Sequence, residues 1–220
     1  MTLEEKKKVE LLEDFVIDCF GDRKQKNCYE PIWKHSLRVG KECLDFISRL
    51  DLNNNILKYA GYVHDIFHDT KTSESDLIHS LSSIFNLPED DKNIKEIVDV
   101  CRKMNRPKHV TVSDYLVALK NTNDDVLFII KSLEMNDKLK MSVKNYTSFK
   151  DRWWYCISNS KTHLISMLDN KIKQYEDDID KRNIFSEIKF FLEKNIEYSE
   201  ENYNTLFSMN DKNEKFYRYR

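Results

Sequence analysis

Glycine and proline are scarce in this 220-residue chain, which contains only three of each. Sheets joined by tight turns need these residues at their turn positions, so the scarcity disfavours a fold rich in β-structure. We therefore expect a nearly all-helical protein. The length suits one medium-sized domain with a sizeable core, with room for an appended segment.

Paired cysteines and long apolar runs are also missing. The five cysteines are odd in number, widely spaced and never form a Cys-x-x-Cys pair, which argues against a disulfide framework and a cysteine zinc site. This usage fits a reducing cytoplasm, where we expect the protein. No apolar run approaches the length that spans a bilayer, and the first segment, MTLEEKKKVELLEDF, lacks the apolar core of a signal peptide. We expect no membrane partner.

An excess of one charge sign is absent as well. The 36 Lys and Arg residues nearly balance the 38 Asp and Glu residues, which leaves a net charge of −2. Such a chain has no single-sign field that would attract extended nucleic acid or an anionic membrane. Mixed charges of this kind usually form solvated helix faces with i,i+4 pairs.

Apolar residues recur at helical spacing along most of the chain. The expected helices cover approximately residues 3–20, 32–50, 56–67, 76–85, 93–104, 114–120, 126–141 and 149–168. Beyond residue 170 the chain becomes more charged but keeps a helical apolar stripe, and no Pro/Gly/Ser-rich linker precedes it. We therefore expect a main domain over residues 1–170 and additional C-terminal helices over residues 171–220, with a frayed end.

One expected helix carries titratable side chains within an apolar run. The stretch AGYVHDIFHD at 60–69 contains two His-Asp pairs, His64–Asp65 and His68–Asp69. Successive helical residues turn by about 100°, so all four side chains fall on one arc of the helix. Hydrogen-bond partners, a bound cation or simple exposure could each satisfy them. A histidine and a carboxylate on one arc offer a nitrogen and an oxygen ligand to a divalent cation.

Two more ligands from other helices would complete such a metal site. His35 lies on the apolar side of the second expected helix, and Asp137 follows the most apolar stretch of the chain. The other candidates are His79, His109 and His163. A lone histidine near an apolar face is more often structural than a ligand. Asp137 taken alone could equally cap a helix or form a salt bridge.

The ordered set H … HD … D, formed by His35, His64–Asp65 and Asp137, resembles the HD superfamily of metal-dependent phosphohydrolases. Five stretches extend the resemblance: EPIWKH (30–35), GYVHDIFHDTKTSESDL (61–77), EIVDVCRKM (96–104), IIKSLEMNDKLKM (129–141) and NYTSFKDRWWYCISNSK (145–161). They are most similar to the hydrolase domain of RelA/SpoT-type proteins, in particular to the small stand-alone enzymes that remove pyrophosphate from the 3′ position of (p)ppGpp. The resemblance covers about residues 5–170.

This resemblance implies an HD-type helical bundle and specific residue roles. It makes His35, His64, Asp65 and Asp137 the ligands of one divalent metal, in that family usually Mn²⁺, with Fe²⁺ or Zn²⁺ as alternatives. Asp69 falls on an aspartate of the family that takes part in the hydrolytic step.

Three positions depart from the family pattern. His68 replaces a glutamate that serves in proton transfer or water positioning; its imidazole could do the same work near neutral pH, or bind metal beside His64. Lys26 replaces an arginine that packs near the guanine, which keeps the charge but loses the planar fork. Met141 replaces an asparagine, which removes a polar contact expected near the substrate.

We therefore expect a metal-dependent phosphohydrolase that acts on a nucleotide or another phosphorylated small molecule, such as a (p)ppGpp 3′-pyrophosphohydrolase. Asp69 and His68 would orient or deprotonate the attacking water. Lys26, Lys138 and Arg106 would neutralise phosphate charge. The alternative is a catalytically impaired HD-fold module that binds a nucleotide or a protein partner, and a third option is a helical interaction protein whose His and Asp residues are merely capped or paired. The sequence leaves the metal, the substrate and the oligomeric state open.

Overall fold

A computed structural model describes the chain except for residues 25–28, 51–54, 121, 123 and 218–220, and it describes side chains as far as residue 207, apart from residue 55. The described residues are almost entirely helical and contain no β-strand, only an isolated bridge between Lys24 and Pro31. The predicted all-α fold is confirmed. In the part of the chain described, no helix has the length and apolarity needed to cross a bilayer.

The chain forms two compact units. The first comprises Met1–Gln25 and Pro31–Glu134, and the second comprises Lys26–Glu30 and Met135–Arg220. The division falls inside helix α8 (Asp125–Lys140), whereas the sequence pattern places it at residue 170. The division after residue 134 has no sequence signal such as a linker or a change of composition, because it falls within one uninterrupted helix.

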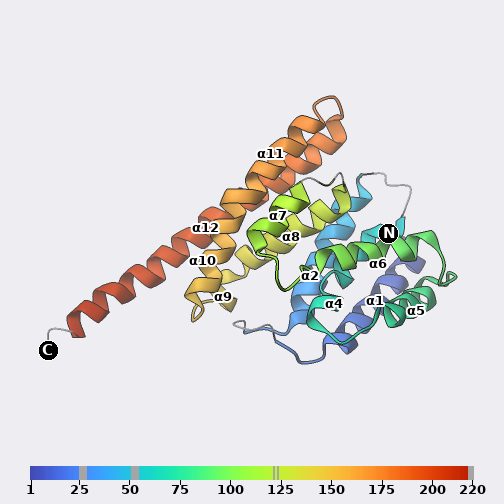
Figure 1. The fold of residues 1–220 in the computed structure, drawn as a ribbon, viewed down its shortest axis with the longest axis horizontal. Helices are drawn as coiled ribbons and strands as arrows, with labels where there is room; N and C mark the ends of the chain where they lie inside the picture. Colours follow the sequence, from blue (N-terminus) through green and yellow to red (C-terminus); the bar gives the residue numbers. More distant parts are fainter. Residues whose placement is uncertain (25–28, 51–54, 121, 123, 218–220) are drawn as a thin grey trace. The chain divides into compact units, whose positions relative to one another are not determined.

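The first unit is built from short and medium helices (Figure 1). They are α1 (Leu3–Phe20), α2 (Ile32–Ser48), the 3-10 helix η1 (Asn55–Tyr59), α3 (Ala60–Val63), α4 (Ile66–Asp69), α5 (Glu74–Phe85), α6 (Lys92–Met104), α7 (Val112–Lys120) and the first part of α8. Helix α2 packs against α1 and α3, and α3 also packs against α6. Capping boxes at Thr2 and Ser73 fix the starts of α1 and α5.

Two glycines allow α2 and α3 to approach closely. A Cβ atom at Gly40 would lie 2.3 Å from the ring of Tyr62, and one at Gly61 would lie 2.7 Å from the Cys43 side chain. A larger residue at either position would have to displace a buried neighbour. Two of only three glycines in the chain therefore set the spacing between α2 and α3.

The helix predicted over residues 56–67 is interrupted rather than continuous. It consists of η1, α3 and α4, with a turn at His64 and Asp65 between the last two. Asp65 has φ −95° and ψ 3°, a sparsely populated conformation that recurs in active-site residues. The two His-Asp pairs consequently do not share the face that a continuous helix would give them: His64 and Asp65 are buried, whereas the side chain of His68 is 52% exposed.

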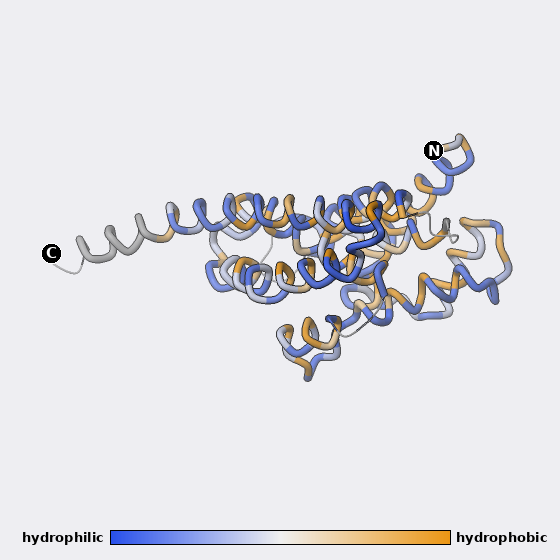
Figure 2. Tube along the Cα trace, turned by 90° about the horizontal axis from the view of Figure 1, so that it is seen from above, coloured by the Kyte–Doolittle hydropathy of each residue, from blue (hydrophilic) through white to orange (hydrophobic). Residues whose placement is uncertain are grey.

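The second unit contains the end of α8 and the helices that follow. These are α9 (Ser142–Asn145), α10 (Lys150–Asn159), the π-helical turn η2 (Ser160–Leu164), α11 (Ile165–Gln174) and α12 (Ile179–Tyr217). Helix α11 runs alongside α12, and α10 also packs against α12 (Figure 1). Hydrophobic and hydrophilic residues alternate along the described part of α12 (Figure 2), as expected for a helix that buries one side.

A chain of buried hydrogen bonds ties the second unit together. The indole N–H of Trp153 donates to Ser199 Oγ (2.6 Å), Ser199 donates to Ser142 Oγ (2.9 Å), and Ser142 donates to the Leu139 carbonyl (2.6 Å). Trp153, Ser142 and Ser199 are all fully buried. We call these three residues the serine–tryptophan network. Each of its donors reaches an acceptor, so the network is satisfied without any bound group.

Candidate metal centre

Four buried side chains of the first unit bring potential metal ligands together. His35, His64, Asp65 and Glu134 each offer one ligand atom, and these atoms all lie within 4.8 Å of one another. His35 comes from α2, His64 and Asp65 come from the turn between α3 and α4, and Glu134 comes from α8. We call these residues the His-Asp-Glu group. A set of two imidazoles and two carboxylates could hold a divalent metal ion.

The imidazole of His64 is oriented by the backbone. Its Nδ1 lies 2.7 Å from the carbonyl oxygen of Gly61, which can only accept, so Nδ1 carries the proton. This fixes the tautomer and directs the lone pair of Nε2 into the group, as in metal-ligating histidines. Nε2 is buried and makes no hydrogen bond with the described residues. His64 therefore has the orientation of a ligand.

Asp65 lies between the two histidines. Its Oδ2 atom is 3.2 Å from His64 Nε2 and 3.8 Å from His35 Nε2. The two rings meet edge to face, with their centroids 5.5 Å apart. Because Nδ1 of His64 carries the proton, Nε2 of the neutral ring and the Asp65 oxygen both present lone pairs, so their approach calls for a positive charge between them.

The electrostatics of the group favour that positive charge. Burial alone would lower the pKa of His64, but the adjacent Asp65 carboxylate, assisted by Glu134, outweighs it and raises the pKa above its ordinary value. The same carboxylates act on the buried surroundings: burial raises the pKa of Tyr115, and the charges of Glu134 and Asp65 raise it further. A proton or a metal cation would each relieve this concentration of negative charge.

Glu134 has a cationic neighbour on its own helix. The ammonium of Lys131 donates to Glu134 Oε2 at 2.7 Å, and the two side chains are 12% and 4% exposed. The His-Asp-Glu group thus contains two carboxylates, of which one is paired with a lysine.

Three of the four predicted metal ligands, His35, His64 and Asp65, lie together in this group. The fourth, Asp137, is buried on α8 three residues after Glu134 and is not a member of the group. Its role as a ligand stays a prediction. Glu134 was not predicted, although a signal exists: an acidic residue lies one helical turn before Asp137, directly after an apolar run.

The predicted catalytic pair lies just beyond the turn. His68 Nδ1 and Asp69 Oδ1 are 2.9 Å apart, and Arg23 donates to the backbone carbonyl of Asp69 at 3.2 Å. The side chain of His68 is half exposed, whereas that of Asp69 is largely covered. Neither residue belongs to the His-Asp-Glu group, and their roles stay predictions.

The predicted phosphate-binding residues are placed as follows. Lys26 lies outside the described residues. Lys138 is a half-buried residue of α8 in the second unit. The guanidinium of Arg106 donates to the carbonyl oxygens of Pro107 and Val110, which bind it to its own loop. A role of Lys26 or Lys138 in binding phosphate stays a prediction.

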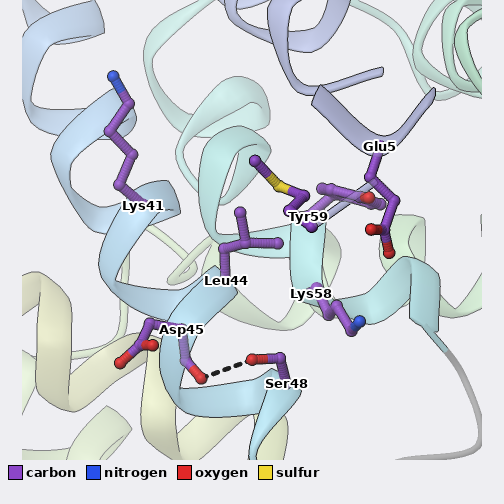
Figure 3. Close-up of a pocket in the computed structure, with 8 residues that line it drawn as sticks. Glu5, Lys41, Leu44, Asp45, Ser48, Lys58 and Tyr59 are labelled. Atoms are coloured by element: carbon purple, nitrogen blue, oxygen red, sulfur yellow. Dashed lines mark hydrogen bonds between the residues drawn. The ribbon is translucent and has the colours of Figure 1, made fainter. Parts of the chain in front are cut away.

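A separate surface pocket of about 310 Å³ lies in the first unit (Figure 3). It is lined by Met1, Glu5, Lys41, Leu44, Asp45, Ser48, Lys58 and Tyr59. Ser48 Oγ donates to the backbone carbonyl of Asp45. The lining has charges of both signs and includes no residue of the His-Asp-Glu group.

Comparison of the chain with protein-family models found no match, and comparison with curated proteins found none either. Function is therefore inferred from the residues themselves.

Proposed function

We propose that this protein is a metal-dependent phosphohydrolase of the HD type that acts on a nucleotide, with the 3′-pyrophosphate of (p)ppGpp as the first substrate to test. The observation that carries the proposal is that His35, His64 and Asp65, distant in sequence and ordered as in the HD superfamily, lie within one buried group. Mn²⁺ is the metal we expect, because that family usually uses it; the carboxylates of the group suit Mn²⁺, whereas its imidazoles suit Fe²⁺ or Zn²⁺.

The residues of the group would hold the metal through Nε2 of His64, the imidazole of His35 and the carboxylate of Asp65. A bound divalent metal lowers the pKa of its water and polarises a phosphoryl oxygen. The hydrogen bond from His64 Nδ1 to the Gly61 carbonyl keeps the ring in the required tautomer.

His68 and Asp69 support the proton-transfer half of the proposal. The pair shares a hydrogen bond of 2.9 Å, and His68 remains open to water. A carboxylate that orients an imidazole is the usual arrangement for a general base near neutral pH. In this proposal Asp69 positions the ring and His68 accepts the proton of the attacking water.

The test begins with elemental analysis of protein purified without chelator, followed by turnover of (p)ppGpp and a panel of deoxynucleoside triphosphates with added Mn²⁺. We expect hydrolysis of at least one nucleotide and a loss of at least about a hundredfold in kcat/KM for His64→Ala. His79→Ala is the matched control, because His79 is an exposed histidine of α5 that pairs with Glu89. Full metal-dependent hydrolysis by His64→Ala would contradict the proposal.

One observation favours a non-catalytic HD-fold module as the second candidate. The Lys131 ammonium supplies Glu134 with a counter-charge that needs no metal. A protein that binds (p)ppGpp or another nucleotide, yet shows no turnover with Mn²⁺, Fe²⁺ or Zn²⁺, would support this candidate over the hydrolase.

A further inference from the structure

We propose that Lys131 is a built-in counter-cation of the His-Asp-Glu group, with which a divalent metal must compete for the carboxylate of Glu134 in order to bind with all four ligands. The inference rests on the metal-binding part of the proposed function and is independent of hydrolysis. It assigns to Lys131 the role of a positioning residue that sets the affinity of the site.

The Lys131–Glu134 pair differs from the other helix-surface ion pairs of the first unit in its burial. Its two side chains are 12% and 4% exposed, whereas Lys92 and Glu96, spaced i,i+4 on α6, are 87% and 36% exposed. Exposed ion pairs contribute little to the free energy of unfolding, so removing either partner changes stability only slightly. Removing one partner of a buried pair leaves an uncompensated charge in a poorly solvated place. Lys131 therefore supplies a counter-charge that the buried carboxylate of Glu134 needs.

A second contact holds the lysine in place. Lys131 Nζ lies 5.4 Å from the ring centroid of Tyr115, a distance at which an ammonium is attracted to an aromatic face. The Tyr115 hydroxyl donates to the Lys103 carbonyl at 2.9 Å, which fixes the ring. The ammonium thus interacts with both an anchored ring and a carboxylate.

The charges then determine the effect on metal binding. With neutral imidazoles, two carboxylates and one ammonium, the local charge is −1; without Lys131 it is −2. The ammonium of Lys131 occupies Oε2 of Glu134, so a metal must either share that oxygen with the ammonium or coordinate through the other one, and the nearby ammonium repels it in both cases. Lys131 therefore satisfies Glu134 in the metal-free protein and weakens the site for any divalent ion.

The test compares three full-length variants by titration with Mn²⁺ and Zn²⁺ alone, measured by calorimetry and by competition with a chelating dye. Lys131→Met removes the charge but keeps an unbranched stem, and we expect Kd to tighten by about tenfold or more, the scale of effects from groups that contact metal ligands. Lys131→Arg retains the charge, so we expect its Kd to lie within about threefold of the wild-type value. Lys92→Met is the matched control on an exposed pair, and we expect no change.

A second measurement keeps the inference testable if Lys131→Met folds poorly. The melting temperature of Lys131→Gln should fall in EDTA, because Glu134 loses the ammonium of Lys131, and should rise more on addition of Mn²⁺ than that of the wild type. Equal Kd values for wild type and Lys131→Met, or equal Mn²⁺-induced shifts for wild type and Lys131→Gln, would overturn this inference and leave the proposed metal site intact. Absence of metal binding in the wild type and in every variant would overturn the proposed function itself. Binding only after Lys131 is removed would support the inference most directly.

Discussion

The two units of this protein both bury polar side chains, but they satisfy them in opposite ways. In the serine–tryptophan network of the second unit, every donor points at an acceptor, and the last hydrogen bond is accepted by the backbone carbonyl of Leu139. In the His-Asp-Glu group of the first unit, Nε2 of His64 lies 3.2 Å from the carboxylate of Asp65, an approach that is favourable only with a proton or a metal ion between the two atoms. Buried polarity alone is therefore no sign of function; the informative feature is the convergence of four potential ligand atoms within 4.8 Å of one another.

The difference has an energetic consequence. A satisfied buried network stabilises the fold and loses stability when any member is deleted. A group of converging acceptors destabilises the metal-free fold and becomes favourable only when a cation is bound. Three substitutions test this contrast.

Asp65→Asn should have the largest effect of the three substitutions, and that effect should be on the affinity for the metal ion. The amide removes one charged ligand, so we expect Kd for Mn²⁺ to weaken by at least about a hundredfold. The melting temperature in EDTA should not fall at a pH above the raised pKa of His64, because the amide N–H can then donate to the neutral His64 Nε2. Calorimetry and thermal melts measure the two effects. A fall in the EDTA melting temperature with unchanged metal affinity would mean that Asp65 is structural, as in the second unit.

Ser199→Ala should reduce stability in the second unit. The substitution leaves the Trp153 indole N–H without its acceptor, so we expect a loss of about 1–3 kcal/mol in the free energy of unfolding, measured in urea. Ser186→Ala on the same helix is the control, because its hydroxyl donates only to the Arg182 carbonyl one turn earlier. If both variants unfold at the same urea concentration, the network contributes nothing beyond local helix bonding.

Tyr62→Phe should have the smallest effect. The Tyr62 hydroxyl is buried and has no hydrogen-bond partner among the described residues, while its ring packs against Gly40. Removing the hydroxyl keeps the ring contact, so we expect the free energy of unfolding to stay unchanged or to rise by up to about 1 kcal/mol. A loss of more than that in urea unfolding would show that the hydroxyl is satisfied by an ordered water.

Much of the fold could be predicted from the sequence, because scarce glycine and proline together with helical spacing of apolar residues leave few alternatives to an all-α chain. The interruption at His64 and Asp65 could not, since apolar residues at Val63 and Ile66 continue the helical pattern across it. The division inside α8 could not be predicted for a related reason: helical periodicity shows that a helix exists but not which neighbours each part of it contacts.

The candidate site was predictable only in part. His35, His64 and Asp65 were predicted together because their order resembles that of the HD superfamily. Glu134 was missed because a glutamate three residues after a lysine has the spacing of an ordinary surface ion pair on a helix. Only the tertiary structure shows that Lys131 and Glu134 are buried, and this burial is the reason we expect the pair to affect metal binding.

The seam between α2 and α3 links the chemistry of the first unit to its architecture. Gly40 and Gly61 each meet a side chain of the opposite helix where a single methyl group would not fit, and the Gly61 carbonyl also anchors His64. His35 lies on one of these helices, and the His64–Asp65 turn directly follows the other. The separation of the two histidine backbones is thus set by the close packing of α2 against α3, so a change in that separation would require buried side chains to move.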